Sequence, residues 1–467
     1  MPVPEQVRGW ADPQIFRLLG LAQRVDVSGF ERDYRSDGVG GLPYDPRLML
    51  VTVWWCYQRQ WRSPQEMARA CREQASLRVV WQRERVPSAA CLRRFVQGHR
   101  GGWQTVADSL VGVCDRAGLV DVSVTATDST PVKAPAALSK MLTAPRITTR
   151  IDDVRQELQA LHARRQAMVD EAGADVFLEQ GCGDLIRAEQ LLLVRLARLE
   201  KAEAAARLRG ESGPAPVDPV ALWQARVDRH ATELADMIRC QQQRCDAYQE
   251  KVAAGRKPRG PAPRLPEDDA RIHQKRRSLQ TARRRVARAQ DSARTARDGP
   301  VPRANITDPN ARILKGKLNT SAWILGWLLT ITVISGQFII AGLLSPHGND
   351  AHGLLPNLTA ATVTCRNAGI TPAFGHHLAD GGFAAIDLPE AITGTPLIGV
   401  TTEHPATDQD LYARRSPMVE PVFAHLLRTD RRLHTRGHAA QTETIAMITA
   451  YNAGKYLRQT RTTRHGT

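Results

Sequence analysis

Three acidic residues stand at the ends of elements that the sequence predicts, where catalytic side chains are usually carried. Asp128 closes the alternating run "VDVSVTATDST", which predicts a strand that ends at this residue. Asp380 follows "HHLA" and precedes two glycines, and Glu420 begins "EPVFAHLL", a helical segment whose other inward residues are apolar. A carboxylate in such surroundings has to be paired, protonated or bound to a cation.

Three carboxylates that meet across a mixed sheet would offer the oxygen ligands that Mg²⁺ prefers. Two such ions can hold the attacking and leaving oxygens of an in-line phosphoryl transfer. If their carboxylates converge, Asp128, Asp380 and Glu420 are candidates for such a site. The alternative is that each acid is a helix cap or a surface residue, which is the commoner role of a single acid.

The chain has 467 residues and a formal net charge of +16. Such a balance favours nucleic acid or an anionic membrane surface as the partner, and the alternative is a soluble protein that is simply basic. The eight cysteines form no C-x-x-C pair, so we expect reduced thiols in a cytoplasmic, nucleoid-associated protein. The first residues contain no apolar run after a basic end, so no signal peptide is expected.

An uncharged stretch runs from Ser321 to Pro346 and is long enough to span a bilayer, which takes about 20 apolar residues. Its centre argues against a single helix, because "SGQ" at 335–337 is typical of a turn. The flanking "LLTITVI" and "FIIAGLL" are short and rich in β-branched residues. Residues 321–345 are therefore predicted to form a hairpin of two buried strands, and no membrane association is expected.

The first 118 residues are predicted to be helical. Asp45 before Pro46, Ser63 with Glu66, and Ser88 are typical helix N-caps. Two short capped helices joined by a loop would suit a helix-turn-helix reader of DNA, with Arg93 and Arg94 as DNA contacts. An ordinary small helical bundle is the alternative.

Residues 148–300 are long, charged and helical in pattern, which predicts a helical hairpin or a coiled-coil-like insertion. Its last helix is strongly basic, and Arg283, Arg284 and Arg285 are candidates for contacts with a phosphate backbone. A solvated helical face is the alternative.

Several segments together resemble the DDE transposases of bacterial insertion sequences. "TATDSTPVKA" resembles the first aspartate motif, "ANITDPNARIL" the linker that re-enters the catalytic core, and "HLADGGF" the second aspartate motif. "YARRSPMVEPVFAHLLRTDRRLHTRG" is similar to the glutamate helix, and "GLPYDPRLMLVTVWWCYQRQWRSPQEMARACRE" to the N-terminal helical region. The resemblance implies Asp128, Asp380 and Glu420 as the catalytic acids and as the ligands of two Mg²⁺ ions, with Mn²⁺ as a substitute. It also places Lys133, Arg415 and Arg428 near DNA phosphates.

The resemblance implies a mixed α+β fold: a ribonuclease H-like α/β core of residues 119–147 and 301–467, interrupted by the helical insertion 148–300. An all-helical DNA-binding domain, residues 1–118, would precede the core. The implied activity is Mg²⁺-dependent cleavage and strand transfer at insertion-element ends, with double-stranded DNA as the partner and a homodimer on DNA. The second hypothesis is a non-catalytic DNA-binding protein, either a decayed and inactive transposase copy or a helix-turn-helix regulator.

Overall fold

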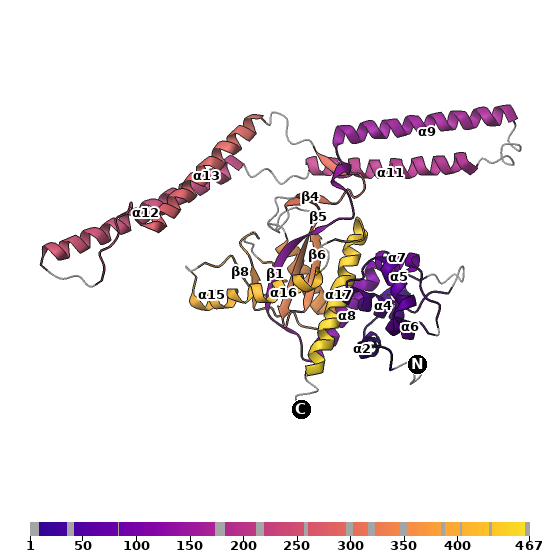
Figure 1. Cartoon of the computed structure of the whole chain (residues 1–467), viewed down its shortest axis with the longest axis horizontal. Coiled ribbons are helices and arrows are strands. Elements are labelled where there is room, and N and C mark those ends of the chain that lie inside the picture. Colours follow the sequence, from indigo (N-terminus) through magenta and orange to yellow (C-terminus); the bar gives the residue numbers. More distant parts are fainter. Residues whose placement is uncertain are drawn as a thin grey trace. The chain divides into compact units, whose positions relative to one another are not determined.

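The computed structural model describes residues 9–34, 42–82, 84–172, 183–211, 219–255, 260–295, 302–315, 323–345, 353–383, 388–401, 404–428 and 432–462. The fold is mixed α+β, with helices before, within and after one mixed sheet (Figure 1). Contacts group the chain into two compact units. One comprises Met1–Leu142, Leu161–Ala202 and Ala304–Thr467, and the other Thr143–Ala160 and Glu203–Arg303.

The N-terminal region is helical, as predicted. Its helices are α2 (Pro13–Ala22), α3 (Ser28–Glu31), α4 (Pro46–Gln58), α5 (Pro64–Glu73), α6 (Ala75–Val80), α7 (Ala89–Gly98) and α8 (Arg100–Asp115). The predicted caps are confirmed. The carboxylate of Asp45 accepts from the amide of Arg47 at 2.7 Å, and Ser63 and Glu66 form a reciprocal capping box. The hydroxyl of Ser88 accepts from the amide of Cys91 at 3.2 Å.

A six-stranded sheet forms the centre of the first unit. Its strands are β1 (Asp121–Lys133), β4 (Arg312–Lys315), β5 (Trp323–Ser335), β6 (Ile339–Ser345), β7 (His376–Ala379) and β8 (Thr395–Ile398). The order is β4-β5-β1-β7-β8, and β6 also pairs with β5. β5 runs antiparallel to β1, β4 and β6, whereas β7 runs parallel to both β1 and β8. A separate two-stranded ladder joins β2 (Met141–Thr143), after the short helix η1 (Leu138–Lys140), to β3 (Arg303–Asn305).

The prediction that the first strand ends at Asp128 is wrong. β1 continues to Lys133, because every residue from Thr125 to Lys133 has a partner on the long strand β5. Pro131 is tolerated inside this strand, and Asp128 lies in its interior.

The prediction of a buried hairpin is confirmed for the described part of residues 321–345; residues 321 and 322 lie outside the described residues. β5 and β6 pair antiparallel from Leu328 to Val333, and the turn uses a positive φ at Gly336 (80°) and Gln337 (63°). Ten consecutive residues of β5 are buried, from Leu325 to Ile334. Within the described ranges, no helix has the length and apolar character needed to cross a bilayer.

Four further helices pack on the sheet or beside it: α14 (Leu354–Asn367), α15 (Ala406–Ala413), α16 (Arg415–Leu426) and α17 (His438–Thr462). α16 packs against β1 and β5. α17 packs against β6 and also against α2, α4, α7 and α8. The N-terminal helices and the sheet therefore share one continuous hydrophobic core, in which the indole of Trp54 donates to the hydroxyl of Thr449 at 3.0 Å. The domain boundaries expected from the sequence stay a prediction.

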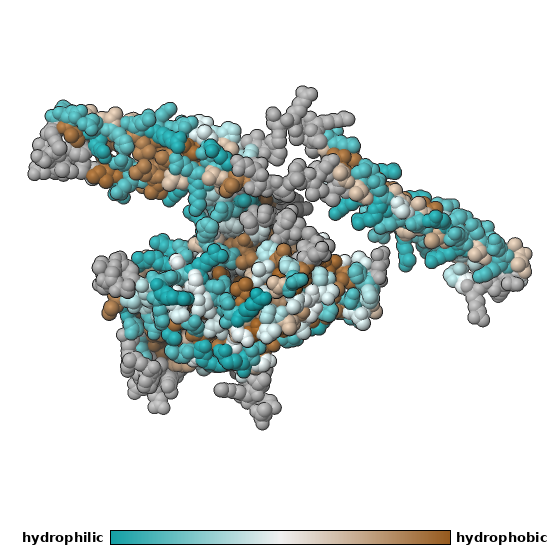
Figure 2. Space-filling model, turned by 180° about the vertical axis from the view of Figure 1, so that it is seen from behind, coloured by the Kyte–Doolittle hydropathy of each residue, from teal (hydrophilic) through white to brown (hydrophobic). Residues whose placement is uncertain are grey.

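Among its described residues, the insertion contains four long helices: α9 (Ala144–Ala172), α11 (Gly183–Glu211), α12 (Pro219–Ala253) and α13 (Ala270–Thr295). The expected helical hairpin is present, but as two successive pairs, α9 with α11 and α12 with α13 (Figure 1). On the face shown in Figure 2, hydrophilic residues cover most of the α12–α13 pair, whereas apolar residues gather on α9 and α11. The exposed apolar side chains of α9 and α11 include Met168, Ile186, Leu193 and Val194.

Candidate functional site

Asp128 and Asp380 occupy equivalent places on neighbouring parallel strands. The register of β1 and β7 runs from Val124 opposite His376 to Thr127 opposite Ala379. The next residue on each side is an aspartate, Asp128 on β1 and Asp380 immediately after β7. Because adjacent strands lie about 4.8 Å apart, the structure brings these two predicted acids together.

Asp128 is well packed, and its contacts include two with nitrogen atoms of neighbouring residues. Its side chain is only 15% exposed. One carboxylate oxygen, Oδ1, accepts from the amide of Ser129 at 2.7 Å. The other, Oδ2, lies 3.3 Å from Nη1 of Arg415, the first residue of α16. The side chain of Arg415 is 18% exposed, so the ion pair is largely shielded from water.

Asp380 begins a tight turn at the end of β7. Its Oδ1 accepts from the amide of Gly382 at 2.6 Å, which closes the turn, and the residue is half-buried. The turn lies against the end of β8, where Gly399 has a φ of +57°. A Cβ at Gly399 would lie 2.9 Å from the Cα of Gly381, so these glycines let the two strand ends approach each other.

The opposite face of β1 carries a buried ladder of hydroxyl groups that the sequence reasoning missed. The hydroxyl of Thr127 lies 2.9 Å from that of Thr332, and the hydroxyl of Ser129 lies 2.8 Å from that of Thr330, both on β5. Such cross-strand pairs fix the lateral position of one strand against the next. The alternation of Thr and Ser at every second position of β1 was the available signal.

His377 extends this ladder to β7. Its Nε2 lies 2.7 Å from the carbonyl oxygen of Thr393, which can only accept, so Nε2 carries the proton. Nδ1 then accepts from the hydroxyl of Thr125 at 2.6 Å. The side chain has no exposed surface, and burial lowers the pKa of His377 below its ordinary value of 6.5. A neutral imidazole therefore ties β1 to β7, three residues before Asp380.

Glu420 lies on α16, the helix that packs against β1, but its side chain is exposed. Its carboxylate accepts a hydrogen bond from the hydroxyl of Ser416, one turn earlier on the same helix. The buried side of α16 is formed by Met418, Val419 and Val422. The structure thus brings the helix of Glu420 to the strand of Asp128, whereas the carboxylate of Glu420 stays on its own helix.

The start of α16 is fixed by the turn between β5 and β6. The side-chain amide of Gln337 donates to the carbonyl of Pro417 at 3.0 Å. Lys455 and Tyr451 of α17 donate in turn to the side chain and the main-chain carbonyl of Gln337, at 2.9 Å and 3.1 Å. The "SGQ" turn therefore positions the residue that contacts Asp128.

The donor set fits a hard divalent cation in part. Asp128 and Asp380 offer carboxylate oxygens on adjacent strands, the ligand type that Mg²⁺ prefers. The carboxylate of Glu420 would act as a third ligand only after its hydrogen bond with Ser416 is broken. In the part of the chain that the structure describes, no group of three or more His, Cys, Asp or Glu side chains is arranged to hold a metal ion.

The remaining predicted basic residues of the first unit lie on the surface. Lys133 ends β1, and strand alternation points it to the opposite face from Asp128, because β1 pairs with β5 without irregularity between the two. Arg428 is exposed just after α16. Arg93 and Arg94 are exposed on α7, and Nη2 of Arg94 lies 3.4 Å from the sulfur of Cys91.

The predicted arginines of the insertion are exposed on α13. Arg283, Arg284 and Arg285 all point to solvent, and the guanidinium of Arg285 lies 4.4 Å from the ring centre of Trp223 on α12. Arg226 lies 4.7 Å from the same ring. Beside them, a hollow of about 390 Å³ is lined by Arg229, His230 and Arg277 as well as by these residues.

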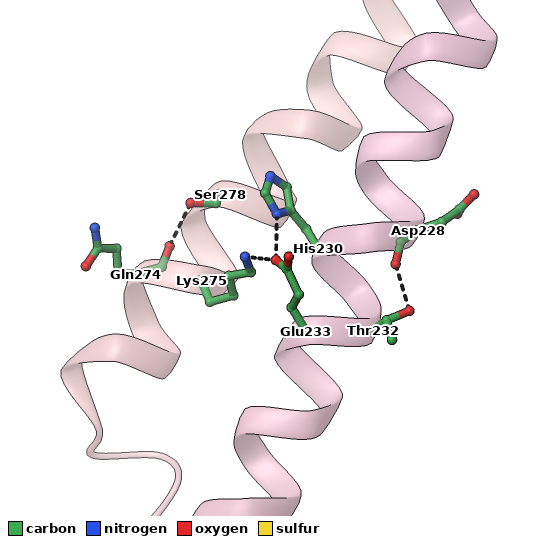
Figure 3. A network of polar contacts seen from close by, with 7 residues as sticks. All are labelled: Asp228, His230, Thr232, Glu233, Gln274, Lys275 and Ser278. Carbon is green, nitrogen blue, oxygen red and sulfur yellow. Dashed lines mark hydrogen bonds and ion pairs between the residues drawn. The ribbon is translucent and has the colours of Figure 1, made fainter. Parts of the chain in front are cut away.

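The two helices of this basic pair are held in register by a polar network (Figure 3). The carboxylate of Glu233 on α12 accepts from the ammonium of Lys275 on α13, and it lies 3.4 Å from Nδ1 of His230. Val227, Leu279, Ala282 and Val286 form the apolar seam between the helices. The seam leaves the arginines of α13 on the outside.

No family model matches the chain, and neither the curated proteins nor the solved structures contain a match to it.

Proposed function

We propose that this protein is a DDE-type transposase with a ribonuclease H-like core, which cleaves DNA at insertion-element ends and transfers the freed strand. The observation that carries the proposal is the placement of Asp128 and Asp380 side by side on parallel strands. The antiparallel hairpin β5–β6 on the other side of β1, and the packing of α16 on β1, support it further. The three acid-bearing motifs of the resemblance all belong to one unit of the fold.

Asp128, Asp380 and Glu420 are the side chains that would hold two Mg²⁺ ions or, as a substitute, Mn²⁺. Bound divalent ions would supply an activated water and would neutralise charge on the reacting phosphate. The chain itself supplies a rigid frame for the acids: the hydroxyl ladder fixes β1, His377 fixes β7, and Gln337 fixes the start of α16. Rigid strands suit this task because ligand geometry must be held closely for phosphoryl transfer.

Double-stranded DNA is the proposed partner, bound by a homodimer in the cytoplasm. The exposed arginines of α13 and of α7 would neutralise phosphates along the duplex. Arg415 and Arg428, which lie on or just after α16, would contact phosphates nearer to the acids. Lys133, on the opposite face of β1 from Asp128, would contact a phosphate further away.

A non-catalytic DNA-binding protein is the second candidate, either a decayed copy or a helix-turn-helix regulator. One observation favours it: the carboxylate of Glu420 is exposed and bonded to Ser416 of its own helix. A copy that has lost cleavage would keep the arginine surfaces and would still bind DNA.

The test is cleavage of a duplex that carries the inverted repeats flanking the coding sequence, with and without Mg²⁺. Asp128→Asn, Asp380→Asn and Glu420→Gln should each abolish the Mg²⁺-dependent nick, while DNA affinity measured by fluorescence anisotropy stays the same. Asp121→Asn is the matched control, because Asp121 is exposed at the start of the same strand and accepts from the amide of Ser123. DNA binding by the wild-type protein without any metal-dependent nick would establish the second candidate instead.

A further inference from the structure

Two consecutive residues at the start of α16 each contact one of the predicted acids. Arg415 places Nη1 3.3 Å from Oδ2 of Asp128, and the hydroxyl of Ser416 donates to the carboxylate of Glu420. A side-chain cation thus stands at the carboxylate that the proposed function assigns to a metal ion. Metal binding at Asp128 has to displace or outweigh this positive charge.

The helix that carries Arg415 is firmly held. A metal ion could therefore replace the guanidinium at Asp128 through a movement of the Arg415 side chain alone. Met418, Val419 and Val422 are buried, and the carbonyl of Pro417 is held by Gln337. The arginine itself stands at the first position of α16, next to the break between α15 and α16 at Arg414. Its guanidinium lies 5.8 Å from the ring centre of Tyr412, an aromatic face on which a released guanidinium can rest.

Because the Arg415–Asp128 ion pair is shielded from water, the guanidinium competes strongly with a divalent cation for the carboxylate of Asp128. Both side chains are less than a fifth exposed, so the repulsion between a guanidinium and a divalent cation at one carboxylate is weakly screened. A neutral side chain at position 415 would remove that repulsion.

We propose that Arg415 is an exchangeable counter-ion of Asp128: it neutralises the carboxylate in the metal-free protein and is released when a divalent cation binds. The released guanidinium is then available to a phosphate of the substrate. This inference rests on the proposed function. It adds that metal binding and phosphate binding are coupled through one side chain, so that the arginine becomes available only once the metal has arrived.

The experiment is a titration of the full chain with Mn²⁺ in the absence of DNA, followed by electron paramagnetic resonance of the free ion. Arg415→Gln should bind Mn²⁺ at least about tenfold more tightly than the wild type, since a tenfold change needs only about 1.4 kcal/mol of removed repulsion. Arg414→Gln is the matched control, because it removes the same charge from the neighbouring residue, whose Nη2 lies 3.4 Å from the hydroxyl of Ser335. It should bind as the wild type does.

The double variant Asp128→Asn with Arg415→Gln should not show the tighter Mn²⁺ binding of Arg415→Gln. This result would assign the tighter binding to Asp128. If the wild type binds Mn²⁺ and Arg415→Gln binds it no more tightly, the counter-ion role is refuted while the metal site stands. If neither protein binds Mn²⁺ at millimolar concentration, both the counter-ion role and the proposed metal site are refuted. Circular dichroism of each variant checks that the fold is retained.

Discussion

The guanidinium of Arg62 donates a hydrogen bond to the main-chain carbonyl of Leu426, although 364 residues separate the two in sequence. Arg62 lies between α4 and α5 and is 5% exposed, and Leu426 is the last residue of α16. The N-terminal helices are therefore bonded directly to the helix that carries Arg415 and Glu420. This buried contact adds to the shared hydrophobic core that already joins the two regions.

Arg62→Ala should destabilise the protein by about 1–3 kcal/mol, because it leaves a buried carbonyl at the end of α16 without this donor. Urea unfolding followed by tryptophan fluorescence measures the change. Eight of the nine tryptophans lie in the first unit, all but Trp223, so the signal reports that unit. Arg93→Ala, at an exposed position of α7, should shift the unfolding free energy by less than about 0.5 kcal/mol.

Gly326→Ala should also be strongly destabilising. A Cβ at this position would lie 1.8 Å from the carbonyl oxygen of Val132, because Gly326 lies opposite Lys133 in the antiparallel pairing of β5 with β1. The two strands must move apart at the end of β1, and overpacking of this kind costs about 1–3 kcal/mol. Gly98→Ala on α7 has open space around it and should leave stability unchanged or raise it slightly. Equal unfolding midpoints for the two variants would contradict the close approach of β1 and β5.

His377 should make stability depend on pH. Burial lowers its pKa in the folded state, whereas in the unfolded chain the imidazole titrates near its ordinary value of about 6.5. Below that pH the unfolded chain binds the extra proton and the folded chain does not. The contribution of His377 is therefore present above pH 6.5 and is lost as the pH falls through the folded-state pKa.

The wild type should accordingly lose stability relative to His377→Gln as the pH falls from 7.5 to 5.5, by at most about 1.4 kcal/mol per pH unit. Urea unfolding of both proteins across this range gives the difference, in which the other titrating groups cancel. Parallel stability curves would mean that the folded protein accepts the proton on His377 at no cost.

The arginines of α13 should govern the salt dependence of DNA binding. For duplex DNA, the logarithm of affinity falls with the logarithm of salt concentration by about 0.9 per neutralised phosphate. Replacing Arg283, Arg284 and Arg285 with Gln should reduce the slope by up to about 2.7 without changing sequence preference. The triple Arg→Lys variant keeps the charge and should keep the slope. An unchanged slope in the Gln variant would leave the α12–α13 pair as a spacer.

Local patterns predicted individual elements well. Asp45, Ser63 and Ser88 begin helices as their capping signatures indicate, and the "SGQ" turn folds the uncharged stretch into two strands. Helix starts and tight turns depend on residues that are close together in the sequence, so they can be predicted from the sequence alone.

Long-range relationships escaped prediction. The strand of Asp128 runs five residues further than its own pattern indicates, because its partner β5 is long enough to pair with all of it. The contact of Arg415 with Asp128 depends on where α16 packs on the sheet. That position is set by the hydrogen bond from Gln337 and by the apolar face of the helix. The spacing of residues in the sequence does not predict the position at which a helix packs on a sheet. The side-by-side placement of Asp128 and Asp380 was expected only from the resemblance.

The dependence of the N-terminal helices on α17 bears on how the protein is made. Trp54 and Thr449 are 395 residues apart, and at about 5–20 residues per second a ribosome needs roughly 20–80 s to travel between them. Throughout that time α4 presents to the cell an apolar surface whose cover has not been synthesised. This apolar surface of the nascent chain stays uncovered until α17 emerges. A message broken before the codon for His438 would yield a product in which the core around α4 cannot be completed.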